Sequence, residues 1–111
     1  MNIEKEKVND VVVLRPVGKL VIGDPIEAFR NTLNSVVKEG ARKVVIDLSK
    51  VDYMDSTGLG ELVRAFTTLK KNNGELKLAS MTSKIKDLMT MTKLLTVFEN
   101  YEKLEDAIKS F

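Results

Sequence analysis

The chain has 111 residues, a net charge of +2 and 31% charged residues, and it contains no histidine, cysteine or tryptophan. Sites that activate a serine or cysteine through a histidine base therefore cannot form, and neither can zinc sites built from histidine and cysteine. A length of this order is typical of one domain, so we expect residues 1–111 to form a single domain.

The distribution of apolar and charged residues argues against a membrane or nucleic-acid role. The longest apolar run, Val11–Leu14, is far shorter than the ~20 residues of a spanning helix, and the charged N-terminus is not a secretory signal. The lysines between Lys70 and Lys93 are scattered and have no aromatic residues between them for base stacking. We therefore expect a cytoplasmic protein that neither binds nucleic acid directly nor inserts into a membrane. No nucleotide-binding motif is present, and no cofactor is expected.

The first part of the chain predicts a β-hairpin followed by a helix. A β-branched segment, Val11–Val17, follows the turn signal Asn9-Asp10, which pairs it with a weaker strand over Ile3–Val8. Asp24 is then a candidate N-cap, with Pro25 at the first helical position. Apolar residues continue at helical spacing to a stop at Gly40, namely Ile26, Phe29, Leu33, Val36 and Val37.

The middle of the chain predicts a buried strand, a helix and a second short strand. Lys43–Leu48 is nearly continuously apolar, as expected for a strand buried on both faces of a parallel sheet. Apolar residues from Leu59 to Leu69 mark a second amphipathic helix, which ends at Asn72-Asn73-Gly74. Leu76–Ala79 follows as a short strand.

The last part predicts a third helix through Ile85 and Leu88, a short strand or buried loop over Leu95–Phe98, and a terminal helix that includes Leu104 and Ala107. This order predicts an α/β domain with a mixed, mostly parallel sheet of about four to five strands and about four helices.

One segment, Val51–Gly60, lies where the central strand gives way to the second helix, a common position for sites in α/β sheets. Its aspartate, serine and threonine are favoured N-caps, so the segment could simply start a helix. Gly58 and Gly60 favour a function, because each costs about 0.5–1 kcal/mol inside a helix with no expected return in packing. A bare backbone would admit another surface, and a phosphate on Ser56 would meet free N–H groups.

Other side chains have competing interpretations. Ser56 is not expected to be a nucleophile, since no histidine can take its proton, and no catalytic residue is predicted. Glu61 and Arg64 would form a weak surface pair or, less favoured, a partner-contact rim. Met81, Met89 and Met91 would fill the core or, less favoured, form an adaptable binding surface. Asp47 and Asp55 have no second signal for an acid–base pair, and strand-end aspartates commonly bond backbone.

Three segments together resemble the STAS domain, and most closely the stand-alone bacterial anti-sigma-factor antagonists. They are Val44–Ser49, Val51–Gly60 and Gly74–Leu78, of which the core Asp55-Ser56-Thr57-Gly58-Leu59-Gly60 is the most specific. The resemblance covers nearly the whole chain, including the opening strand pair and a Gly18-Lys19-Leu20 turn into the first helix. It implies a mixed sheet with helices packed on it.

The resemblance also implies partner switching. In the family, the serine that Ser56 matches is phosphorylated by an anti-sigma factor that is also a serine kinase, and a PP2C-type phosphatase reverses this. The unphosphorylated antagonist binds the anti-sigma factor and frees the sigma factor, whereas the phosphorylated form is released. The partner-binding residues expected in this chain are Asp24, Asp55, Ser56, Thr57, Gly58, Leu59, Gly60, Glu61 and Arg64, with no metal ligands.

The chain departs from the family pattern at one place. Family members often have an acidic residue shortly after the Gly-x-Leu turn, which contributes to the kinase contact, whereas this chain has Lys19 and Val21 and reaches Asp24 only later. Some relatives with this motif serve other assemblies, so the alternative is a constitutive scaffold subunit of a stress-sensing or membrane-lipid transport complex. An oxygen-ligand metal hydrolase is a formal third class. We expect a monomer or weak dimer.

Overall fold

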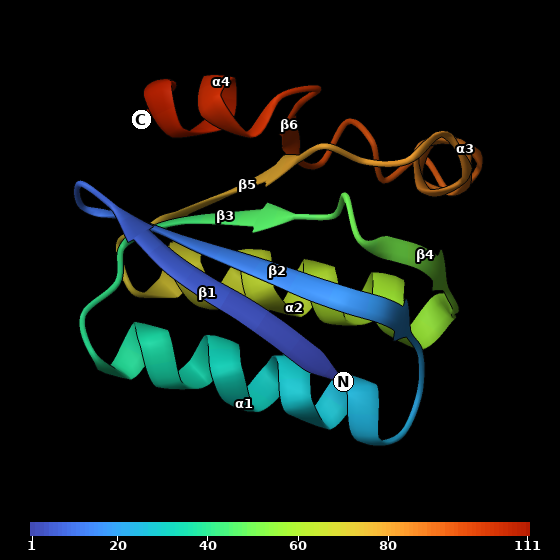
Figure 1. Ribbon diagram of the computed structural model, residues 1–111, viewed down its shortest axis with the longest axis horizontal. Helices are drawn as coiled ribbons and strands as arrows, with labels where there is room; N and C mark the ends of the chain where they lie inside the picture. Colours follow the sequence, from blue (N-terminus) through green and yellow to red (C-terminus); the bar gives the residue numbers. More distant parts are fainter.

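A computed structural model describes all residues, 1–111, and places six strands in one mixed sheet of order β1-β2-β3-β5-β6, with β4 paired to β2. The strands are β1 (Asn2–Val8), β2 (Val11–Leu20), β3 (Lys43–Asp47), β4 (Val51–Met54), β5 (Glu75–Ala79) and β6 (Glu99–Tyr101). The helices are α1 (Asp24–Lys38), α2 (Ser56–Lys71), α3 (Ser83–Met91) and α4 (Leu104–Lys109). Helices α1 and α2 cover one face of the sheet, and α4 lies on the other (Figure 1). The predicted α/β class, mixed sheet and four helices are confirmed.

The chain opens with the predicted hairpin. β1 and β2 pair antiparallel from Asn2 opposite Val17 to Val8 opposite Val11. Asn9 at the tip has a φ of 57°, a left-handed conformation that asparagine adopts more readily than most residues. All the other pairings are parallel, and helices connect β2 to β3, β4 to β5 and β5 to β6.

The predicted turn at Gly18-Lys19-Leu20 is wrong, because these residues continue β2. They pair parallel with β4, and the register shifts between Gly18 and Lys19. An irregularity of this kind bends a strand, so β2 pairs with β3 through Val11–Leu14 and with β4 through its last residues. The bend brings the end of β2 to the start of α2.

The central strand β3 is buried on both faces, as predicted, because successive side chains point to opposite sides of the sheet. Val45 packs with Val13 of β2 in the small apolar cluster under α4. Val44 and Ile46 belong to the larger cluster that α1, α2 and α3 complete. The sheet therefore separates two apolar cores.

Two boundaries differ from the sequence prediction. Asp24 is the first residue of α1 rather than its N-cap, because Gly23 holds the cap position with a φ of 104° that favours glycine. Segment Val51–Met54, expected to connect the central strand to the second helix, forms strand β4. Its central residues, Asp52 and Tyr53, are both exposed, so the segment lacks the alternation that predicts a strand. The last strand, β6, begins just after the predicted segment Leu95–Phe98.

None of the helices is both long and apolar enough to span a membrane.

Candidate functional site

Helix α2 begins at Ser56, at the end of the sheet where β2 ends and α1 begins (Figure 1). Asp55 caps this helix, since its Oδ1 accepts a hydrogen bond from the backbone N–H of Gly58 at 2.8 Å. Its Oδ2 accepts another from the N–H of Ile22, in the loop between β2 and α1, at 3.0 Å. One carboxylate thus holds the start of α2 against the loop that precedes α1.

The same contacts define the charge of the site. The N–H groups of Ile22 and Gly58 lower the pKa of Asp55, because they stabilise its ionised form. A negative charge at a helix N-terminus also interacts favourably with the helix dipole. A fixed carboxylate therefore lies one residue before Ser56 at neutral pH.

The two glycines of the motif have different roles. A Cβ at Gly58 would lie 2.2 Å from the carbonyl oxygen of Leu20 and 2.9 Å from Cγ of Met54, so only glycine fits. The prediction that this glycine gains nothing in packing is wrong, because the helix packs directly on the end of β2. Gly60 is exposed, and a Cβ at this position would have no atom within 4 Å. Its open surroundings are what contact with another protein surface requires.

Ser56 is exposed, and Thr57 beside it is half-buried. The first backbone N–H groups of a helix have no partner within the helix. In α2 the N–H of Gly58 donates to the side chain of Asp55. The serine hydroxyl is therefore accessible beside free backbone donors. With no histidine in the chain, this arrangement can accept a modification but has no neighbouring imidazole to activate the hydroxyl.

Glu61, in the second turn of α2, is buried beneath two arginines. Its side chain is 4% exposed, and it accepts hydrogen bonds from Nε and Nη2 of Arg30 on α1 at 3.0 and 2.9 Å and from Nε of Arg64. Burial alone would raise the pKa of Glu61, but the hydrogen bonds and charges of Arg30 and Arg64 outweigh burial and lower it. The preferred interpretation of Glu61 and Arg64 as a weak surface pair is therefore wrong.

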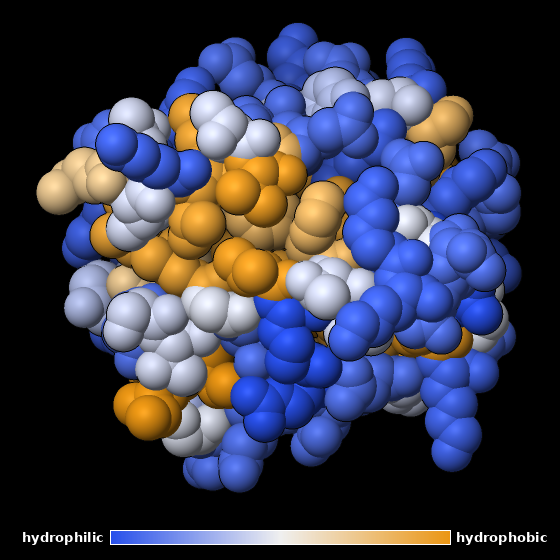
Figure 2. All heavy atoms as spheres, turned by 180° about the vertical axis from the view of Figure 1, so that it is seen from behind, coloured by the Kyte–Doolittle hydropathy of each residue, from blue (hydrophilic) through white to orange (hydrophobic).

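Two strongly exposed apolar side chains lie on elements next to Asp55 and β4. Ile22 is 72% exposed and Met91, at the end of α3, is 80% exposed. A groove of about 240 Å³ between β4 and α3 is lined by Tyr53, Met54, Lys84, Ile85, Asp87, Leu88 and Met91. Figure 2, a view from behind, shows apolar atoms gathered toward the side where α3 lies. Among the methionines expected to fill the core, Met89 is buried, Met81 is half-buried and Met91 is exposed.

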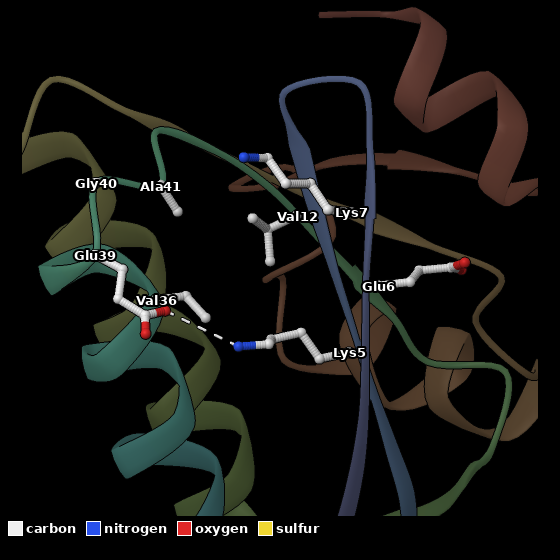
Figure 3. Close-up of a pocket in the computed structure, with 8 residues that line it drawn as sticks. All are labelled: Lys5, Glu6, Lys7, Val12, Val36, Glu39, Gly40 and Ala41. Carbon is white, nitrogen blue, oxygen red and sulfur yellow. Dashed lines mark ion pairs between the residues drawn. The ribbon is translucent and has the colours of Figure 1, made fainter.

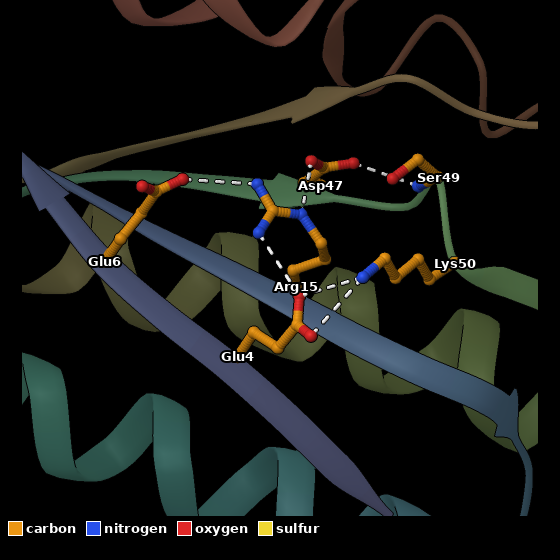
Figure 4. A network of polar contacts seen from close by, with 6 residues as sticks. All are labelled: Glu4, Glu6, Arg15, Asp47, Ser49 and Lys50. Carbon is orange, nitrogen blue, oxygen red and sulfur yellow. Dashed lines mark hydrogen bonds and ion pairs between the residues drawn. The ribbon is translucent and has the colours of Figure 1, made fainter.

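Asp47 belongs to a separate polar network. Its Oδ2 accepts a hydrogen bond from Nε of Arg15 at 2.8 Å, and its Oδ1 accepts one from the N–H of Ser49 at 2.9 Å (Figure 4). Arg15 also contacts Glu4 and Glu6 of β1. The expectation that this aspartate bonds backbone is confirmed, and its further role is to connect β1, β2 and β3.

A pocket of about 300 Å³ lies between β1 and the C-terminal end of α1 (Figure 3). Val12, Val36 and Ala41 contribute its apolar lining, and Lys5 Nζ lies 3.9 Å from Glu39 Oε1 at its edge. It is at the opposite end of α1 from Asp24, so it is not part of the site around Ser56.

A family model provides the identity of the fold. The model for the STAS domain matches residues 2–107. The chain belongs to the STAS domain family. The family resemblance drawn from the motif at Asp55–Gly60 is thereby confirmed.

Individual relatives of this STAS domain are anti-sigma factor antagonists. Over 63 residues it is 43% identical to the anti-sigma-B factor antagonist of Listeria monocytogenes, covering 57% of this chain and about half, 54%, of that protein. It superposes on the crystal structure of an anti-sigma factor antagonist from Mycobacterium paratuberculosis with a TM-score of 0.84, at 25% identity over 98% of this chain and 92% of that one. The phosphorylated form of the Bacillus cell fate determinant SpoIIAA has the same fold, with a TM-score of 0.75 and 21% identity over 98% of each chain.

The expected partner-binding residues of this STAS domain divide by exposure. Asp24, Ser56 and Gly60 are exposed, Asp55, Thr57 and Arg64 are half-buried, and Gly58, Leu59 and Glu61 are buried. The exposed members lie at one end of the molecule, because Asp55 connects the loop before Asp24 to the start of α2. The buried members shape this surface from beneath. Partner binding by all nine remains a prediction.

Sequence reasoning missed two residues of this surface. Ile22 ends the short apolar run Leu20-Val21-Ile22 between a predicted strand and a predicted helix, and an apolar residue directly before the turn residue Gly23 was the available signal. Arg30 lies 31 residues before Glu61, and no local pattern connects the two.

Proposed function

We propose that the protein is an anti-sigma factor antagonist that acts by partner switching. With a free hydroxyl on Ser56 it binds an anti-sigma factor kinase, and with a phosphate on Ser56 it is released. The observation that carries this proposal is the position of Ser56, exposed at the first residue of α2 and next to the fixed carboxylate of Asp55. The protein acts by binding rather than by catalysis, and it meets its ATP-dependent partner in the cytoplasm.

The charge of the site explains the switch. A phosphate adds about −1.5 to −2 charge at neutral pH. The free N–H groups and dipole of α2 favour an anion at this point, so the fold accommodates the phosphate. Asp55 is held by Ile22 and Gly58, so its carboxylate stays beside the new dianion. A partner surface complementary to a neutral hydroxyl then meets concentrated negative charge.

The modification needs chemistry that the partner supplies. The kinase positions ATP, its base accepts the proton of the Ser56 hydroxyl, and the γ-phosphoryl group passes to Oγ as ADP leaves. A PP2C-type phosphatase restores the serine by hydrolysis, with inorganic phosphate as the product. This STAS domain contributes an accessible hydroxyl and a surface that positions it.

The relatives support the proposal at the level of family. The Listeria relative is named an anti-sigma-B factor antagonist, and SpoIIAA has been solved with phosphate attached on the same fold. Both support a STAS domain of this kind as a binding regulator.

The proposal is tested with the kinase-like anti-sigma factor encoded nearest to this protein's gene. We expect Ser56→Ala to bind it constitutively in the presence of ATP and Ser56→Asp to bind at least tenfold more weakly, a loss of about 1.4 kcal/mol. Ser83→Asp is the matched control, because Ser83 is also an exposed serine at the first residue of a helix. Equal binding by Ser56→Asp and Ser83→Asp would contradict the switch.

A second function, a constitutive scaffold subunit without phosphate, is favoured by one observation. Family members often carry an acidic residue near the position of Lys19. Here Nζ of Lys19 lies 3.6 Å from Oδ1 of Asp52 and 6.0 Å from the ring centroid of Tyr53, so the kinase would meet a different surface. Mass spectrometry of the protein from growing and stressed cells separates the two functions. Absence of phosphate on Ser56 in every condition supports the scaffold. Size-exclusion chromatography tests the predicted monomer or weak dimer.

A further inference from the structure

The cluster of Arg30, Glu61 and Arg64 presents unused hydrogen-bond donors at the surface. Arg30 donates from Nε and Nη2 to Glu61, and Arg64 donates from Nε to Glu61 and from Nη2 to Asn34 at 3.3 Å. A guanidinium has five N–H donors, so about three remain on each arginine. The Arg30 side chain is 48% exposed and that of Arg64 is 33% exposed, whereas Glu61 beneath them is buried.

These donors are held in place before any partner arrives. Glu61 binds both arginines from below, and its single negative charge leaves the cluster with one net positive charge. A mobile surface arginine loses side-chain entropy when it binds an anion, and much of that cost is avoided where another contact already orders the guanidinium. The cluster is therefore suited to receive one carboxylate from outside.

Net stabilisation does not explain the cluster well. A buried ion pair often contributes no more stability than apolar residues of the same volume. The cluster does define a charge pattern, because the first turn of α1 carries Asp24 and Glu27 and the next turn carries Arg30. A surface that changes from acidic to basic within two turns selects the orientation of a partner with the opposite pattern.

The cluster is close enough to Ser56 to share one interface with it. Arg64 lies eight residues after Ser56 on α2, which is about 12 Å along the helix axis. Arg30 lies at a similar height on α1, which runs beside α2 (Figure 1). A typical interface of about 800 Å² per partner has a radius of about 16 Å, so a partner docked over Ser56 would cover the cluster.

We propose that Arg30 and Arg64, ordered by Glu61, bind a carboxylate side chain of the anti-sigma factor kinase and thereby set the orientation in which it docks over Ser56. This inference rests on the proposed function, because it names the chemistry with which the same partner is recognised. The contact is independent of the phosphate, since it lies at the second and third turns of α2 rather than at its start.

The test measures binding of the purified kinase to wild type and to Arg30→Gln at low and at high salt. Arg30→Gln should weaken binding about 3- to 10-fold at low salt, mainly through slower association, and less at high salt. Lys38→Gln is the matched control, because it removes the same charge from the last turn of α1 and should change affinity less than about twofold. Arg30→Lys keeps the charge without the planar fork, so it should bind with intermediate affinity, and it replaces Arg30→Gln if that variant fails to fold.

Each outcome separates this inference from the proposed function. If Arg30→Gln and Lys38→Gln bind equally well, or if Arg30→Gln binds more tightly, the carboxylate subsite is overturned, while loss of binding by Ser56→Asp would still support the switch. If wild type does not bind the kinase, both proposals are overturned.

Discussion

The carbonyl oxygen of Leu20, at the end of β2, lies against Gly58 so closely that a Cβ at position 58 would come within 2.2 Å of it. This contact allows the first turn of α2 to rest on the end of β2. It also brings the loop with Ile22 within hydrogen-bond distance of Asp55. The exposed position of Ser56 therefore depends on a buried glycine two residues later.

The glycine pair provides a direct test of this packing. Gly58→Ala should lower the free energy of unfolding by about 1–3 kcal/mol, because the nearest atom is backbone and the strand must shift. Gly60→Ala, in the same turn but in open space, should raise it by about 0.5–1 kcal/mol through better helix propensity. Urea unfolding of both variants measures the difference. If both variants change the free energy of unfolding equally, the close approach of Leu20 does not exclude a side chain at position 58.

The pH dependence of stability should report on Asp55. Its pKa is lowered in the folded protein by the N–H groups of Ile22 and Gly58, whereas the pKa of an unfolded aspartate is about 3.9. A group with a depressed folded pKa stabilises the native state above its unfolded pKa, and this contribution is lost as the pH falls through the folded value. We therefore expect wild type to lose more stability than Asp55→Asn as the pH falls from about 5 to below 3.

Urea midpoints measured across that pH range would show the two curves converging in acid. Asp52→Asn serves as the control, since Asp52 is a neighbouring exposed carboxylate that does not cap α2. A wild-type curve that runs parallel to that of Asp55→Asn would contradict the capping interaction.

The Arg15–Asp47 pair should matter more for stability than the surface ion pairs around it. Asp47 is buried, and Arg15→Met would leave its carboxylate without a cation, which should cost about 2–4 kcal/mol. Adding Asp47→Asn removes the stranded charge and keeps an acceptor for Ser49, so the double variant should recover part of the loss. Lys50→Met, which removes an exposed contact to Glu4, should change little. A double-mutant cycle measures the coupling free energy between Arg15 and Asp47. If the effects of the two substitutions on stability simply add, the pair is not coupled.

Lys77 should hold the C-terminal helix on the sheet. It is buried on β5, where Nζ donates to the carbonyl oxygen and Oγ of Ser110 at 3.1 and 2.7 Å and lies 4.4 Å from the ring centroid of Phe111. Lys77→Met keeps the aliphatic stem but loses these hydrogen bonds, so amide hydrogen exchange over residues 104–111 should accelerate. Exposed Lys109 lies on α4 itself, and Lys109→Met should leave exchange unchanged. Equal exchange in the two variants would exclude the anchoring role.

The local signals in the sequence were sufficient for most of the architecture. The spacing of Ile26, Phe29 and Leu33 predicted α1, and the apolar run in Lys43–Leu48 predicted a central strand covered on both faces. These signals are reliable because burial against a core imposes a period that a short window reveals. The motif at Asp55–Gly60 identified the family because its six residues are contiguous, so a short window of sequence contains the whole motif.

Only the tertiary structure distinguished Gly58 from Gly60, because the atom that excludes a side chain at position 58 belongs to Leu20. It likewise revealed that Arg30 covers Glu61 and that Asp55 holds Ile22, contacts that span 31 and 33 residues. The sequence by itself determined the fold class and the serine that a partner is expected to modify. The surface around that serine was decided by strands and helices that meet only after folding, because no local pattern encodes which distant side chains will become neighbours.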